Sequence, residues 1–111
     1  QVALSLSRRG ITYEFEPDKI PYQRKPSVYI PDFYIPSEGM YIEVKGRLLQ
    51  QDRVKHLLVK KQNPDFEVKF FFANGNKKIY KGSKTSHADW ADKHGFEWAD
   101  KSLPAGWFNG R

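Results

Sequence analysis

The chain has 111 residues and no cysteine, so disulfide bonds and zinc–thiolate sites are excluded. A chain of this length forms one domain with its own core, and an aromatic content of 15% excludes wholesale disorder. The formal net charge of +6 favours a polyanionic partner, most commonly nucleic acid, although a basic surface that only aids solvation is the alternative. No signal-peptide pattern is present, and no apolar run reaches the roughly 20 residues of a membrane span. We therefore expect no membrane partner and a cytoplasmic location.

The N-terminal segment predicts a helix followed by a strand. Apolar residues within positions 2–6 and a closing Gly10 indicate the last turns of an amphipathic helix. The alternating stretch ITYEFE, residues 11–16, predicts a strand. Because the chain begins at Gln1, inside this helix and without a methionine, we expect the natural protein to extend upstream.

A proline-rich connector and two further strands follow. The stretch PDKIPYQRKP, residues 17–26, contains three prolines and predicts an extended, semi-rigid connector with few ladder donors. Residues 27–35 and 40–46 predict two strands, and the turn residues at 36–39 join them.

The periodicity changes to that of a helix over residues 49–62, which Asn63–Pro64 ends. One face of this helix is mainly apolar and comprises Val54, Leu57, Leu58 and Lys61. A second face presents Arg53, His56 and Lys60. Because cations on one helix face suit a phosphate backbone, we predict that these three residues contact DNA.

The remaining elements complete an α/β pattern. The apolar run at residues 67–73 predicts a strand buried on both faces, and the turn signal Asn74–Gly75 leads to a predicted short strand at 77–82. Ser86 with Asp89 resembles a capping box, which begins a short helix closed at His94–Gly95. A last strand is predicted at 96–99. The order α-β-β-β-α-β-β-α-β predicts a mixed sheet flanked by helices.

Three charged residues on the two central predicted strands are the candidates for chemistry. Asp32 and Glu43 lie on strands joined by one turn, so their carboxylates can converge, and Glu43 and Lys45 point to the same face because they are two residues apart. Two converging carboxylates suit Mg²⁺, and the carbonyl of Val44 is a further possible ligand. A metal there would activate water for attack on a phosphate, and Lys45 would orient that water or neutralise the phosphorane. The alternative is a surface Glu–Lys pair with an aspartate in a turn.

A Pro-Asp pair followed 11 residues later by Glu-x-Lys, on apolar strands, resembles the PD-(D/E)xK pattern of the restriction-endonuclease-like nuclease superfamily. The chain further resembles the phage endonuclease I family of Holliday-junction-resolving enzymes over nearly all of its length. The segments that carry this resemblance are ITYEFEPDKIPY, PDFYIP, YIEVKG, DRVKHLLVKKQNP, YKGSKTS, DKHGFEWADK and LPAGW.

The resemblance implies a Mg²⁺-dependent nuclease, with Mn²⁺ able to substitute, that cuts four-way and other branched DNA. Asp32, Glu43 and Lys45 match the family's catalytic residues, and the Val44 carbonyl matches a metal ligand. The resemblance also implies a further acidic residue, a glutamate on the N-terminal helix that the partner subunit supplies, at a position expected just upstream of Gln1.

The resemblance also implies a homodimer that exchanges N-terminal elements. Residues 1–111 are then one nuclease domain, with residues 1–20 exchanged, residues 17–26 as the bridge, and residues 27–111 as the catalytic core. We expect residues 1–20 to pack on the partner's core, because prolines in the bridge disfavour folding back.

Other readings remain open from the residues alone. A general or sequence-specific nuclease on the same fold, and a non-catalytic protein that binds DNA junctions, are the two alternatives. The other chemical side chains receive structural predictions: His87 and His94 at helix ends, and Trp90, Trp98 and Trp107 in core packing.

Overall fold

The computed structural model describes residues 2–15, 20–23 and 26–108. In chain order the elements are α1 (Val2–Arg8), β1 (Glu14–Phe15), β2 (Ile20–Gln23), β3 (Pro26–Tyr29), β4 (Phe33–Ile35), β5 (Met40–Lys45), α2 (Gln50–Gln62), β6 (Val68–Phe72), α3 (His87–Lys93), β7 (Trp98–Asp100) and the 3₁₀ helix η1 (Ala105–Phe108). Within these ranges no helix has the length and apolar character needed to span a membrane.

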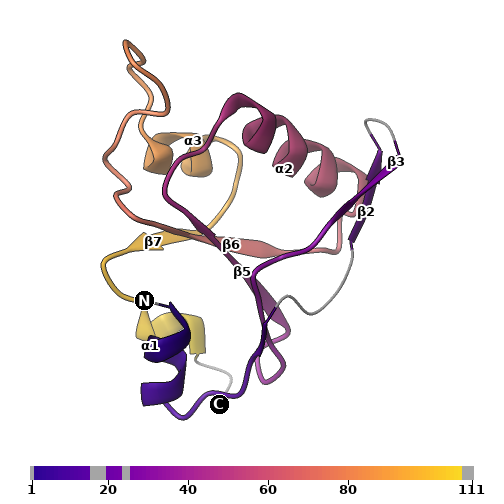
Figure 1. The fold of residues 1–111 in the computed structure, drawn as a ribbon, viewed down its shortest axis with the longest axis vertical. Coiled ribbons are helices and arrows are strands. Elements are labelled where there is room, and N and C mark those ends of the chain that lie inside the picture. The colour runs from indigo at the N-terminus through magenta and orange to yellow at the C-terminus, as the bar shows by residue number, and fades with distance from the viewer. Residues whose placement is uncertain (1, 16–19, 24–25, 109–111) are drawn as a thin grey trace.

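The central sheet is mixed, as the sequence predicts. Its five strands lie in the order β1-β4-β5-β6-β7, with β1, β4 and β5 antiparallel and β5, β6 and β7 parallel. The parallel connections run through α2 and through the segment that contains α3, because parallel neighbours require a crossover. Both helices cover one face of the sheet, whereas α1 and η1 lie against the other (Figure 1).

Two hydrophobic clusters fill the two faces of the sheet. Leu6 of α1 packs with Phe33 and Ile42 of the sheet on one face. Phe70 and Phe72 lie under α2 and α3 on the other face, with ring centroids 5.5 Å apart. Strand β6 is therefore covered on both sides, which confirms the prediction made from its continuous apolar run.

The N-terminal unit packs on its own chain in this structure. Helix α1 ends in a Schellman motif, in which Gly10 has φ +68° and the Ile11 N–H donates to the Leu6 carbonyl at 3.0 Å. Strand β1 pairs with β4 of the same chain, and Leu6 and Ile11 join the cluster around Phe33. The sequence predicts that residues 1–20 pack on a partner subunit, whereas in this single chain the described residues 2–15 pack on their own β4 and β5.

The predicted extended connector folds back as a hairpin where the structure describes it. Strands β2 and β3 pair antiparallel in a separate two-stranded sheet, with Pro21 opposite Val28 and Gln23 opposite Pro26. Both strands of such a sheet are edges, so a proline can leave its missing N–H on the open side. Residues 17–19 and 24–25 of the predicted connector lie outside the described ranges.

Several predicted strands differ from the observed ones, and the strands expected at 11–16 and 96–99 are observed as the shorter β1 and β7. The strand expected over 27–35 is divided near Pro31 into β3 and β4, because proline cannot donate to a ladder. The strand predicted at 77–82 is wrong: the described chain has only an isolated bridge there, between Lys78 and Ser86. Lysine-rich residues 77–84 offer too little apolar surface for a strand to bury.

Candidate active site on the helix-covered face of the sheet

Strand alternation places the three predicted catalytic residues on one face. Phe33 lies opposite Ile42 in the antiparallel pair β4–β5, and both face α1. Since side chains alternate along a strand, Asp32, Glu43 and Lys45 face α2. The structure thus brings together the three residues that the sequence singled out.

A backbone hydrogen bond holds Asp32 against β5. The Val44 N–H donates to Asp32 Oδ2 at 2.9 Å, while the next carbonyl, of Lys45, accepts from the Ala73 N–H on the β6 side at 3.1 Å. The N–H and C=O of one strand residue point to the same side of the strand. The Val44 carbonyl therefore points toward Asp32, as expected of a shared ligand site.

Lys45 is held between two carboxylates. Its Nζ lies 3.5 Å from Glu43 Oε2 and 3.4 Å from Asp52 Oδ1. Asp52 stands in the first turn of α2, where its Oδ2 also accepts from the Leu49 N–H at 3.1 Å. Asp52 was not among the predicted site residues, although an acidic residue in the first turn of the helix that follows Lys45 is a signal for such a partner.

Glu43 is the most enclosed member of the site. Only 5% of it is exposed, and the Tyr29 hydroxyl donates to its Oε1 at 2.6 Å. Burial raises the pKa of Glu43, the hydrogen bond from Tyr29 opposes this rise, and the neighbouring Asp32 carboxylate adds to it. Tyr29 was not among the predicted site residues.

The donor set fits a divalent cation. Burial and the neighbouring Asp32 carboxylate both disfavour the charged form of Glu43, and an ion such as Mg²⁺ would offset both effects. Among the described residues no three acidic or histidine side chains gather as a metal cluster. The donors available to a metal are thus the carboxylates of Asp32 and Glu43 and the Val44 carbonyl.

His56 is buried, which contradicts its predicted contact with DNA. It is 1% exposed, and its ring lies between those of Tyr29 and Phe70, with centroids 5.0 and 4.8 Å away. Neither ring nitrogen hydrogen-bonds to the described residues, and burial lowers the pKa of His56 to about 3. The prediction failed because aromatic packing, rather than hydropathy alone, decides which face of α2 turns inward.

The two other predicted DNA contacts on α2 have partners within the protein. Arg53 donates to the Leu48 carbonyl, and its guanidinium lies 5.8 Å from the centre of the Tyr80 ring. Lys60 Nζ donates to the carbonyls of His94 and Gly95 at 2.9 and 3.1 Å. These side chains fasten α2 to neighbouring loops.

The histidines and tryptophans predicted as structural occupy such places. His87 is the first residue of α3, after the Ser86 cap, and His94 closes the helix. Trp90 is 5% exposed in the cluster around Phe70, whereas Trp98 and Trp107 are half-buried against the clusters.

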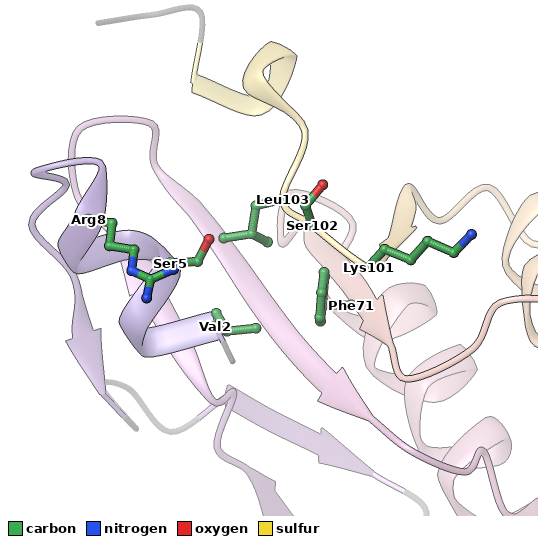
Figure 2. Close-up of a pocket in the computed structure, with 7 residues that line it drawn as sticks. All are labelled: Val2, Ser5, Arg8, Phe71, Lys101, Ser102 and Leu103. Atoms are coloured by element: carbon green, nitrogen blue, oxygen red, sulfur yellow. The ribbon is translucent and has the colours of Figure 1, made fainter.

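A cavity of about 220 Å³ lies away from this site. Figure 2 shows it between α1 and the segment that follows β7, and its lining residues are Val2, Ser5, Arg8, Phe71, Lys101, Ser102 and Leu103. Phe71 alternates with Phe70 and Phe72, so the cavity is on the α1 face of the sheet. It contains no part of the carboxylate site.

The fold and site define an α/β protein that carries two carboxylates and a lysine on the face of its mixed sheet that α2 and α3 cover. A family model described as Phage endonuclease I matches residues 1–111. Endonuclease I of Escherichia phage T7 is 40% identical over 109 residues, covering 96% of this chain and 72% of that protein. Endodeoxyribonuclease 1 of Enterobacteria phage T3 is 41% identical over 106 residues, covering 94% and 69%. The chain belongs to the phage endonuclease I family, which confirms the resemblance seen in the sequence.

Proposed function

We propose that this protein is a Mg²⁺-dependent endodeoxyribonuclease that resolves four-way junctions and other branched DNA by paired nicks. The observation that carries the proposal is the convergence of Asp32, Glu43 and Lys45 on one face of the sheet, with Lys45 Nζ 3.5 Å from Glu43. Family membership supports a nuclease, since the two relatives are named as an endonuclease and an endodeoxyribonuclease. The preference for branches rests on the family resemblance.

Each side chain has a distinct role in this proposal. Asp32, Glu43 and the Val44 carbonyl would hold Mg²⁺, with Mn²⁺ as a substitute. When bound, Mg²⁺ supplies the Lewis acidity that activates a water nucleophile and stabilises charge on the phosphate. Lys45 places a fixed cation beside that position, where it orients the water or offsets the negative charge of the phosphorane. Asp52 helps to hold the Lys45 ammonium in place through an ion pair of 3.4 Å.

The active form in this proposal is a homodimer with exchanged N-terminal elements. In the single chain α1 and β1 contact β4 and β5 of the same chain, and an exchange between two copies would reuse these same surfaces. Two sites related by a twofold axis would then nick two strands of like polarity. Sedimentation equilibrium at micromolar concentration tests this assembly, and a folded monomer there would exclude it.

Cleavage assays with defined substrates test the activity. Four-way junction, linear duplex and single-stranded DNA of the same sequence are each incubated with the protein in Mg²⁺, Mn²⁺ or EDTA. We expect paired nicks in the junction with either metal and no cleavage in EDTA. Equal cleavage of duplex would indicate a general nuclease, and binding without cleavage would indicate a junction-binding protein.

A further inference from the structure

A basic pocket lies at the same edge of the sheet as the candidate active site. Strands β5 and β6 are parallel, so their carboxyl ends meet at one edge, where the Ala73 N–H donates to the Lys45 carbonyl. The segments that leave these strands, residues 46–49 and 73–86, therefore start side by side. The second of them projects from the body of the molecule between β6 and α3 (Figure 1).

His87 joins these two segments. The Leu48 N–H donates to His87 Nε2 at 3.0 Å, so that nitrogen is an acceptor. His87 Nδ1 must then carry the proton that it donates to the Lys77 carbonyl, 2.7 Å away. With 1% of its surface exposed, His87 is a buried clamp that sets the position of residues 77–86 relative to the end of β5.

The pocket between the segments is strongly cationic. It has a volume of about 360 Å³ and is lined by Arg47, Lys77, Lys78, Ile79, Tyr80, Lys81 and His87. No carboxylate of the described chain lies within ion-pair distance of Arg47, Lys77 or Lys81. Cations gathered around one hollow without an acid repel one another, and a bound polyanion would relieve that repulsion.

The exposed ring of Tyr80 gives the pocket a second feature. Tyr80 is 58% exposed, and the Arg53 guanidinium lies over its ring at 5.8 Å. An amphipathic ring beside cations suits a ligand that alternates phosphates with sugars and bases. A single small anion would bind the cations but would make no contact with the exposed part of the Tyr80 ring.

We propose that this pocket binds the phosphodiester backbone of the DNA substrate next to the scissile phosphate, with Arg47, Lys77 and Lys81 as its phosphate contacts. The proposal rests on the nuclease function proposed above and replaces the α2 face as the DNA surface. Arg47 is two residues beyond Lys45, so the pocket begins close to the carboxylate site. The His87 clamp keeps this contact in register with the catalytic strand.

Matched triple variants test the pocket. The pocket variant is Arg47→Gln/Lys77→Gln/Lys81→Gln, and the control, with the same loss of charge, is Lys61→Gln/Lys93→Gln/Lys101→Gln. All six positions are exposed, and the control residues lie away from the pocket. Circular dichroism and thermal unfolding verify that both variants fold.

The measured quantity is the affinity for a fluorescent four-way junction in EDTA, by anisotropy, at roughly 50 to 200 mM KCl. In the pocket variant, the negative slope of log K against log salt should become shallower by about 3 for each subunit in contact with DNA. Binding should also weaken about tenfold or more. The control should change the slope by less than about 1. Equal slopes for the two variants would overturn the proposal. Because no cleavage is involved, a loss of slope supports the pocket even if the nuclease assay fails, and unchanged slopes leave the nuclease function standing.

Discussion

The hydroxyl of Tyr29 donates to Oε1 of Glu43 at 2.6 Å, and both residues are buried. Tyr29 stands on β3 in the small sheet, whereas Glu43 stands on β5 in the central sheet. Burial, with the adjacent Glu43 carboxylate, raises the pKa of Tyr29 well above its usual range, so the phenol stays a donor. This hydrogen bond fixes Oε1 of Glu43, a proposed metal ligand, while Oε2 of Glu43 faces Lys45.

Replacing Tyr29 by phenylalanine should weaken the affinity of the site for Mg²⁺. Its effect on the free energy of unfolding should be smaller. The lost hydrogen bond lets Glu43 rotate and removes an interaction that opposes the rise of its pKa. We expect the Mg²⁺ concentration for half-maximal cleavage to rise about tenfold, as for loss of a partner around a metal ligand. Calorimetric titration with Mn²⁺ should show the same weakening without DNA. An unchanged metal affinity would assign Tyr29 to packing alone.

His56 should make the protein less stable in mild acid. Its pKa is lowered to about 3 in the fold, against about 6.5 in an unfolded chain, so the unfolded state binds the proton more readily. The contribution of neutral His56 is complete above pH 6.5 and is lost as the pH falls toward 3. Between pH 7 and 5 the free energy of unfolding should fall by about 2 kcal/mol from this group.

The matched variant for this measurement is His56→Leu, which keeps the volume and removes the titration. Urea unfolding of both proteins from pH 7 to pH 5 should give a smaller loss of stability for the variant. At pH 7 the variant should be at least as stable as the parent, because neither His56 nitrogen has a hydrogen-bond partner among the described residues. Parallel pH profiles would show that His56 does not titrate as a buried group.

Neutralising either carboxylate should abolish cleavage and preserve binding. Asp32→Ala and Glu43→Ala each remove a proposed metal ligand, whereas phosphate contacts supply most of the affinity for DNA. Gel shifts with a four-way junction should match the parent, and nicking in Mg²⁺ should be undetectable. Normal Mg²⁺-dependent turnover by either variant would place the active site elsewhere.

Lys45→Ala should lower the rate of cleavage by about 10²-fold or more, as for a preorganised electrostatic group. Lys45→Ala also breaks the ion pair between Lys45 and Asp52. The comparison is therefore Asp52→Asn, which breaks the same ion pair but keeps the charge of Lys45. That variant keeps Lys45 but loosens its position, and we expect a smaller loss of rate at saturating DNA and Mg²⁺. Equal losses would make position, rather than charge, the contribution of Lys45.

Removing the imidazole of His87 should make residues 77–86, which line the basic pocket, more mobile. In His87→Ala, Leu48 and Lys77 lose their shared partner, so amide hydrogen exchange should accelerate at residues 47–49 and 77–86. Strand β6 should keep its protection, because its bonds to β5 and β7 do not involve His87. Unchanged exchange in the loop would show that other contacts hold it.

The amino-acid sequence by itself determined the elements whose signals are local. The helix at residues 50–62, the Ser86 cap, the glycine end at Gly10 and the buried strand β6 follow from periodicity and capping, which act within a few residues. Spacing and alternation likewise predicted that the carboxylates of Asp32 and Glu43 converge, and that Glu43 and Lys45 point to the same face. Family membership was also visible in the sequence, because the segments that carry it are contiguous.

Only the tertiary structure decided which side chains turn inward and which loops meet. His56 looks polar in sequence, but the rings of Tyr29 and Phe70, 27 and 14 residues away, make its face of α2 the buried one. The hairpin β2–β3, the Tyr29–Glu43 bond and the His87 clamp depend likewise on partners distant in the chain. Local propensity contains no information about such partners, because their free energy arises from packing and hydrogen bonds formed only once the sheet assembles.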